Sequence, residues 1–355
     1  MVGAAPETFH ACEIQKGVLA VRFANLANYL GHPDCKSFFA PVSDDEFLRF
    51  IQDTLQNFQI LKSRPNGNVL VDFFSSNKIV CTKKNVDYRI DRPGGGKLEA
   101  TLILSPSRSE IVEIAGELVE LGATCETPLH SGAWSVEGSP SVIQYDPREA
   151  TVHIGAEKSH MWPWETLAHE LVHAVHSTSG TRALRGSKYE IYMPDRQGQR
   201  SLRYVIRGEE VFTHSRPEVR RQAAEKDGVL DFARVRVNGR REQVMLSAFD
   251  VGMMNDLCNR IKRGKGSDNL QTVLTTRMSM FGIGEWQIIK EFDHSPRSMY
   301  EAPEGMALES KKYRLDSRLP LESLAMACKT VEDAVSAGLA KPLSIVSSIK
   351  SSSCG

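Results

Sequence analysis

The residues best suited to chemistry lie in the run HELVH, at positions 169 to 173. Residues four apart on an α-helix lie one above the other on the same face, so His169 and His173 can direct two imidazole nitrogens at one metal ion. Glu170 lies beside them and can take a proton from a water molecule on that metal, because zinc lowers the pKa of such a water towards neutrality. The spacing therefore predicts a hydrolytic zinc centre with Glu170 as its general base.

The segment around this motif must be helical for the arrangement to form, and its pattern favours a helix. Pro163 stands where a first turn tolerates proline, Glu165 complements the positive end of the helix dipole, and Gly180 follows the expected end. The segment is also rich in apolar residues: Trp164, Leu167, Leu171, Val172, Ala174 and Val175. We predict a buried active-site helix over 163–177. The competing interpretation is a core helix with solvent-facing histidines.

A catalytic zinc site needs a third protein ligand and an open fourth position. One class of zinc peptidases places a further histidine six residues after the second motif histidine. That position is Ser179 here, which excludes this solution. His176 lies on the same helix face but at its edge, so we expect it to support the site or face the substrate, or equally to be a plain packed histidine. The remaining common solution is a carboxylate from a second helix, and Glu209 and Glu210 are the candidates.

The run HELVHAVH, followed by EEVFT at 209–213, resembles two families of zinc peptidases. These are the clostridial neurotoxin light chains and the NleD-type secreted effector metallopeptidases. Both are gluzincins, with an H-E-L-x-H-A helix and a later E-E-x-x-T segment. In both, the second glutamate of the pair binds zinc and the first supports the site. The resemblance therefore implies one zinc ion per chain, with Glu210 as the third ligand and Glu209 as its support.

A third match to these families is the run RSMY at 297–300, which reproduces their R-x-x-Y element. In those proteins the arginine and tyrosine lie beside the scissile carbonyl, so the resemblance gives Arg297 and Tyr300 the role of stabilising the oxyanion. A guanidinium and a phenol are suitable donors for the negative charge that peptide hydrolysis places on that oxygen. Taken alone, R-x-x-Y is a weak motif, and an ordinary surface pair is the alternative.

The resemblance also implies a biological setting, a secreted bacterial effector that hydrolyses a host intracellular protein. The effectors are the better comparison, because neurotoxin light chains are joined to a translocating chain by a disulfide and this sequence requires none. The N-terminal residues lack the basic and apolar regions of a Sec signal. We therefore expect another export apparatus to deliver the protein to the host cytoplasm, and a resident cytoplasmic protein is the alternative.

The composition restricts the function further. The 355 residues include 44 basic and 44 acidic side chains, and this balance argues against a dedicated nucleic-acid binder. No apolar run approaches the roughly 18 residues of a membrane helix, so we expect no membrane span. The seven cysteines form no C-x-x-C pair, which argues against a thiolate zinc site. The expected partner is a protein substrate. The alternatives are a non-catalytic zinc-stabilised interaction module and a resident cytosolic peptidase.

Periodicity in the sequence predicts the elements that position these residues. Helical spacing predicts further helices at 12–30, 44–58, 107–121, 242–262, 268–280 and 320–350. Alternation and β-branched residues predict strands at 68–74, 78–90, 98–105, 141–145 and 151–155. The polar run 185–202 is expected to be a loop, and Ser43 with Glu46 forms a capping box for the second of these helices.

Strands that come before most of the helices indicate an α+β fold. The resemblance makes this fold zincin-like, with a β-sheet and the active-site helix on one side of a cleft and later helices on the other. We divide the chain into an N-terminal α/β region at 1–130, a catalytic domain at 131–300 and a helical C-terminal tail at 301–355. The sequence leaves open whether that tail belongs to the core or binds a partner.

Overall fold

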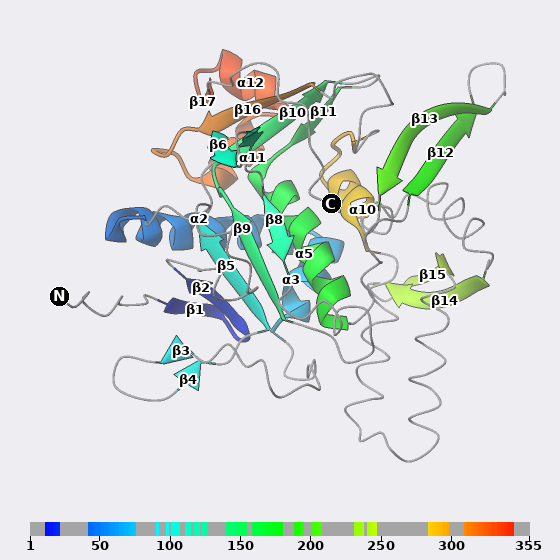
Figure 1. Cartoon of the computed structure of the whole chain (residues 1–355), viewed down its shortest axis with the longest axis horizontal. Helices are drawn as coiled ribbons and strands as arrows, with labels where there is room; N and C mark the ends of the chain where they lie inside the picture. The colour runs from blue at the N-terminus through cyan, green and yellow to red at the C-terminus, as the bar shows by residue number, and fades with distance from the viewer. Residues whose placement is uncertain are drawn as a thin grey trace.

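The computed structural model in Figure 1 describes the predicted active-site helix and the elements that pack on it. The described residues are 11–21, 42–75, 90–91, 97–98, 101–106, 111–114, 117–120, 123–126, 140–154, 158–179, 188–194, 200–207, 231–237, 240–246, 283–297 and 309–343. Among them, no helix is both long and apolar enough to cross a lipid bilayer.

A five-stranded mixed sheet lies beside the active-site helix. Its strands, in spatial order, are β1 (Ala11–Gln15), β2 (Val18–Val21), β5 (Leu102–Pro106), β9 (Ser141–Tyr145) and β8 (Thr124–Glu126). The three central strands are parallel and the two outer ones antiparallel to their neighbours. Every residue of β2 and β9 is buried, which is typical of parallel strands. The sheet joins strands from both sides of residue 130, where the sequence placed a domain boundary.

The hairpin formed by β1 and β2 corrects the helix predicted from residue 12. Gly17 sits in its turn with a φ of 76°, and a Cβ there would lie 2.5 Å from the carbonyl oxygen of Phe74. Only glycine combines this conformation with this close approach. The apolar run that follows suits either a buried strand or a helix, so periodicity alone could not decide between them.

Two consecutive helices, α2 (Asp44–Lys62) and α3 (Pro65–Phe73), pack against the active-site helix. The predicted capping box of α2 is confirmed: Ser43 Oγ accepts from the Glu46 amide at 3.3 Å, and the Ser43 amide donates to the Glu46 carboxylate at 2.8 Å. The strand predicted at 68–74 is wrong, because that segment lies in α3. Proline in the first turn starts this helix, and burial of its apolar face overrides the strand propensity of its valines.

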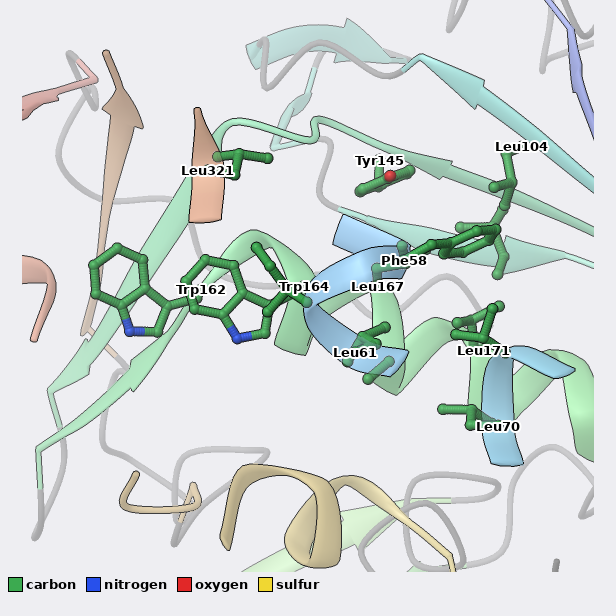
Figure 2. Close-up of a cluster of buried hydrophobic side chains, with 14 of the residues drawn as sticks. Phe58, Leu61, Leu70, Leu104, Tyr145, Trp162, Trp164, Leu167, Leu171 and Leu321 are labelled. Carbon is green, nitrogen blue, oxygen red and sulfur yellow. The ribbon is translucent and has the colours of Figure 1, made fainter. Parts of the chain in front are cut away.

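The active-site helix α5 (Pro163–Ser179) runs through the middle of these layers, as predicted. Figure 2 shows Leu167 and Leu171 of this helix among the core side chains of α2, α3 and the sheet, and both are fully buried. Trp162 and Trp164 stack with ring centroids 5.0 Å apart at its N-terminal end, where neither is exposed. Both indoles therefore anchor the helix to the core.

A second sheet is antiparallel throughout. Its strands, in spatial order, are β11 (Ser159–Met161), β10 (Glu149–Ile154), β16 (Glu309–Leu315) and β17 (Ala340–Pro342). The C-terminal segment supplies the last two strands and two short helices, α11 (Leu321–Ala327) and α12 (Val331–Ser336). Leu321 and Leu324 are fully buried. Residues 309–343 are therefore part of the core, and their helical character is confirmed for α11 and α12 only.

Three hairpins replace other expectations. They are β6 (Ile111–Ile114) with β7 (Glu117–Glu120), β12 (Lys188–Pro194) with β13 (Arg200–Arg207), and β14 (Asp231–Val237) with β15 (Arg240–Leu246). The helix predicted at 107–121, the loop at 185–202 and the start of the helix at 242–262 are therefore wrong. The two segments predicted as helices contain apolar residues that pair across strands as readily as they line a helix, whereas the polar residues at 185–202 suit a loop as well as a hairpin.

The strands predicted at 98–105, 141–145 and 151–155 are confirmed within a few residues, and β3 (Ile90–Asp91) pairs with β4 (Lys97–Leu98). The helix predicted at 268–280 lies outside the described part of the chain, and so does the strand predicted at 78–90, except for its last residue. The architecture as a whole is α+β, as the sequence indicated.

Candidate metal centre

The two motif histidines meet on the buried face of α5. His169 is 7% exposed and His173 is 3% exposed, so the alternative of solvent-facing histidines is wrong. Their Nε2 atoms lie 3.1 Å apart, and the two rings stand nearly perpendicular. Glu170, the predicted general base, is the next residue of the same helix and is 6% exposed. The helix thus brings together three of the predicted site residues in a place closed to bulk water.

The distance between the histidine nitrogens tests whether a zinc ion fits. Zinc binds imidazole nitrogen at about 2.0–2.1 Å, so two such ligands of one tetrahedral ion are about 3.3 Å apart. The observed 3.1 Å is close to that value. Two buried lone pairs pointing at the same place repel each other unless a proton or a cation lies between them. The geometry of His169 and His173 therefore suits a shared metal ion.

Sequence analysis missed a residue that contacts this pair, Glu285. It is the first residue of α10 (Glu285–Glu291), which packs on α5, and it is 1% exposed. His169 Nδ1 lies 2.6 Å from Glu285 Oε2, so we assign the ring proton to Nδ1, where it donates to the carboxylate. That tautomer places a lone pair and not a proton on Nε2, the atom that faces His173 and would bind a metal. Carboxylates commonly orient metal-binding histidines in this way.

Arg297, which the R-x-x-Y motif selected, lies in the same cluster. Its Nε donates to Glu285 Oε1 at 3.0 Å, and its Nη2 donates to Oε2 at 2.6 Å. Nη2 is also 3.0 Å from His169 Nδ1, because both nitrogens donate to the same carboxylate oxygen. Burial would raise the pKa of Glu285, but the charge of Arg297 and the hydrogen bond from His169 outweigh it and hold this pKa well below its usual range.

No signal in the sequence could have identified Glu285 with confidence. It stands alone in a short amphipathic segment, GEWQIIKEF, with no motif spacing to the histidines. It lies twelve residues before Arg297 in the sequence, and this spacing matches none of the motifs found in the chain. Only the packing of α10 on α5 makes this glutamate different from a surface residue.

A third histidine lies near the centre without joining it. His153 of β10 shares a hydrogen bond with Ser310 Oγ at 3.0 Å. Burial lowers its pKa to about 3, and the positive charge of Arg297 acts in the same direction. His153 is therefore a neutral residue of the second sheet at any physiological pH. His176 of α5 is half-buried.

Three residues of the predicted site, Glu209, Glu210 and Tyr300, lie outside the described part of the chain. Among the residues that are described, no group of three or more histidine, cysteine or acidic side chains is arranged to hold a metal. The roles of all three stay predictions. The described centre consists of His169, His173, Glu170, Glu285 and Arg297.

We predict that Glu285→Gln weakens zinc binding about 10- to 100-fold, the usual cost of losing a group that orients a ligand. Glutamine offers one acceptor oxygen in place of two and turns a donor NH2 group towards its present donors, so it loses at least one of the three hydrogen bonds that Glu285 accepts from His169 and Arg297. It also no longer carries the charge opposite Arg297. Competition with a chelator of known affinity measures the change.

The control in the same titration is Glu210→Ala. Loss of a ligand should release the metal altogether, a larger effect than that of Glu285→Gln. Equal zinc affinity in wild type and Glu285→Gln would contradict the orienting role of Glu285.

Comparison with known proteins identifies the fold. No protein-family model matches the chain, and no curated protein sequence matches it. Solved structures do match. The light chain of Clostridium botulinum neurotoxin serotype F aligns with a TM-score of 0.56 over 86% of this chain and 83% of that one, at 15% identity. The botulinum neurotoxin type G light chain aligns with a TM-score of 0.50 over 96% and 91%, also at 15% identity. The chain therefore has the zincin-like α+β fold of these light chains.

Proposed function

We propose that the chain is a zinc-dependent endopeptidase. The observation that carries the proposal is the pair of buried imidazoles on α5, with Nε2 atoms 3.1 Å apart and one of them oriented by Glu285. Glu170 is buried beside them on the same helix. The fold adds support, because the likeness is to the same neurotoxin light chains whose motifs the sequence resembles.

In this proposal His169, His173 and Glu210 hold one zinc ion, with Glu209 as support. A zinc ion bound there would polarise the scissile carbonyl and lower the pKa of a water molecule. Glu170 takes the proton of the attacking water and returns a proton to the leaving amine.

The negative charge that develops on the carbonyl oxygen needs a donor nearby. Arg297 is the first proposed donor, as the R-x-x-Y motif implies, and its guanidinium lies beside His169, where Nε and Nη2 donate to Glu285. Tyr300 is the second proposed donor. Together they would stabilise the oxyanion of the tetrahedral intermediate.

We further propose that the substrate is a protein of a host cell and that the chain is a bacterial effector acting in the host cytoplasm. The motif resemblance to secreted effector metallopeptidases supports this setting. Such a protease would bind its substrate through a surface remote from the catalytic centre as well, because binding energy from remote contacts can be used at the reacting bond. Hydrolysis of a few host proteins is the expected signature.

The test is a search by mass spectrometry for new protein N-termini in a eukaryotic cell lysate. Lysate is incubated with the zinc-loaded protein, with protein stripped by a chelator, and with stripped protein to which zinc is returned. We expect a small set of cuts with the loaded protein, none after stripping, and the same set after zinc is returned.

Other outcomes would favour other functions. Many indiscriminate cuts would indicate a resident general peptidase. One zinc ion per chain with no new N-termini in eukaryotic or bacterial lysate would favour a non-catalytic zinc-stabilised interaction module. Cuts that persist after stripping would contradict a metal-dependent reaction.

A further inference from the structure

The residues that orient His169 come from one short stretch, the α10 segment, which we define as residues 283–297. Glu285 stands near its start and Arg297 at its end, and the two meet again at the imidazole of His169. A chain that leaves a helix must turn back to achieve this. The position of Arg297 therefore depends on whatever holds the residues between α10 and the end of the segment.

A tight cap begins the return. The amide of His294 donates to the carbonyl of Ile289 at 3.2 Å, and the amide of Asp293 donates to that of Lys290 at 3.1 Å. This is the Schellman pattern, which requires a left-handed residue after the helix. Asp293 takes that conformation with a φ of 58°, which is uncommon for a residue other than glycine. The cap sets the direction of the chain but does not attach it to α5.

The attachment is made by His294 and Glu165. His294 Nδ1 donates to Glu165 Oε1 at 2.6 Å. The other oxygen of Glu165, Oε2, accepts the amide of Trp162 at 2.9 Å, so one carboxylate serves both the start of α5 and the α10 segment. Glu165 is fully buried, and the imidazole of His294 lies between the rings of Trp162 and Phe292, with centroids 6.4 and 6.2 Å away.

A second contact attaches the helix α10 to α3. Glu291, the last residue of α10, accepts the backbone amide of Asn66 in α3 at 3.0 and 3.1 Å. This contact secures the helix itself. The residues after the cap, which lead to Arg297, are secured to α5 through His294.

We propose that Glu165 and His294 are positioning residues, whose hydrogen-bonded pair fastens the α10 segment to the start of α5 and so keeps Arg297 against Glu285 and His169. The proposal deepens the proposed peptidase function, because Arg297 is the donor that this function assigns to the oxyanion. Within the described part of the chain, the side chains of the pair hydrogen-bond to each other and to the amide of Trp162, and neither bonds to His169 or His173.

The electrostatics of the pair support this role. Burial lowers the pKa of His294, but its hydrogen bond to Glu165 and the charge of that carboxylate outweigh the burial and raise the pKa above 6.5. Asp293 acts in the same direction, and the charge of His294 in turn contributes to lowering the pKa of His160 of β11. The contribution of His294 is therefore fully present below pH 6.5 and is lost as the pH rises through the raised value. Burial raises the pKa of Glu165, so the pair also loses its charges at low pH, when that carboxylate is protonated.

The test observes Arg297 directly by NMR on protein labelled with ¹⁵N-arginine. Arg297→Lys assigns its Nε–H signal. In His294→Ala we expect this proton to exchange with water about tenfold faster, because exchange of a protected group reports local opening. In His294→Asn, whose amide nitrogen replaces Nδ1, we expect exchange close to wild type. Because base catalyses the exchange of such protons, all variants are compared at one pH, below the titration of His294.

The chain offers a matched control and an internal standard. His160 has the same 16% side-chain exposure as His294 and also faces a glutamate, Glu332 at 2.9 Å, but on α12. His160→Ala should leave Arg297 unchanged. The Nε–H of Arg148, which donates to Asp53 at 2.9 Å, reports global unfolding. Loss of the Arg148 signal in His294→Ala would mean that this variant is unfolded. The exchange of Arg297 is then measured in Glu165→Gln instead.

Activity supplies the last readout, with a lysate protein that wild type cleaves as substrate. We expect kcat to fall about 10- to 100-fold in His294→Ala with little change in KM, because an orienting contact is lost rather than a binding one. Unchanged exchange of Arg297 in a folded His294→Ala or Glu165→Gln protein would overturn the proposal. Failure of wild type to hydrolyse any lysate protein would count against the peptidase function and leave the NMR result to stand alone.

Discussion

Glu170→Gln should lower kcat about 10²- to 10⁴-fold, the usual contribution of a general acid–base residue, while zinc stays bound. Glutamine has the size of glutamate and fits the same buried place on α5, but it cannot take a proton from water. His169 and His173 remain, so the metal should too. Cleavage of a substrate identified in the lysate, supplied at saturating concentration, measures kcat, and metal analysis of the enzyme sample measures zinc.

The control for that variant is Glu322→Gln, a change of the same type at an exposed position of α11. It should hydrolyse at the wild-type rate. A Glu170→Gln protein with full activity and full zinc would show that another group moves the proton. A protein that loses both zinc and activity would instead make Glu170 part of the metal site, contrary to its assigned role.

The active-site helix could be predicted from the sequence because several independent signals agree there. Proline at the first turn, an acidic residue near the N-terminus and glycine after the end all favour the same boundaries as the apolar pattern. The motif itself gave His169, Glu170 and His173, which the structure brings together. The capping box of α2 was predictable for the same reason, since Ser43 and Glu46 satisfy each other locally.

Two of the hairpins, at 111–120 and 231–246, were not predictable because their apolar residues fit two periods at once, and the hairpin at 188–207 was not predictable because its polar residues also suit a loop. The segment 107–121 reads as an amphipathic helix, yet its halves pair as β6 and β7. The opposite error occurred at 68–74, where valine and phenylalanine favour a strand. There the packing of α3 on α2 and α5 decides the structure. Short segments of this kind take the conformation that their tertiary contacts stabilise.

Glu285 and the pair of Glu165 with His294 show a different limit. Sequence analysis assigned Glu165 to the helix dipole, a role that any acidic residue in a first turn can have. Its contact with His294 spans 129 residues of chain, and that of His169 with Glu285 spans 116. A single sequence carries no information on contacts over such distances, so it identified His169 and His173 but neither Glu285 nor the pairing of Glu165 with His294.

Arg148→Met should lower the free energy of unfolding by about 3–5 kcal/mol, the range found when one partner of a buried ion pair is removed. Arg148 follows β9 and donates to both oxygens of Asp53 in α2, at 2.9 and 2.6 Å. Its Nη1 also donates to the carbonyls of Asp316 and Leu319, at 2.8 and 2.7 Å. The variant leaves a buried carboxylate without its partner and two carbonyls without this donor. Urea unfolding measures the loss.

Two further variants separate the buried charge from the lost contacts. In Asp53→Leu/Arg148→Met no charge remains, so much of the stability should return, because apolar side chains often replace a buried ion pair without loss. Arg318→Met makes the same change at an arginine whose side chain is 83% exposed, and it should have little effect. A loss for Arg148→Met no larger than that for Arg318→Met would contradict the prediction.

The position of Arg148 gives this stability effect a functional consequence. It ties α2 to the loop between β16 and α11, so it holds the C-terminal segment that supplies β16 to the sheet of β10 and β11. β11 in turn leads directly into α5. Removal of residues 309–355 should therefore abolish the zinc centre as well as the fold, whereas a partner-binding tail could be removed without loss of metal. Zinc content of the truncated chain, measured with that of Arg148→Met, decides between these roles.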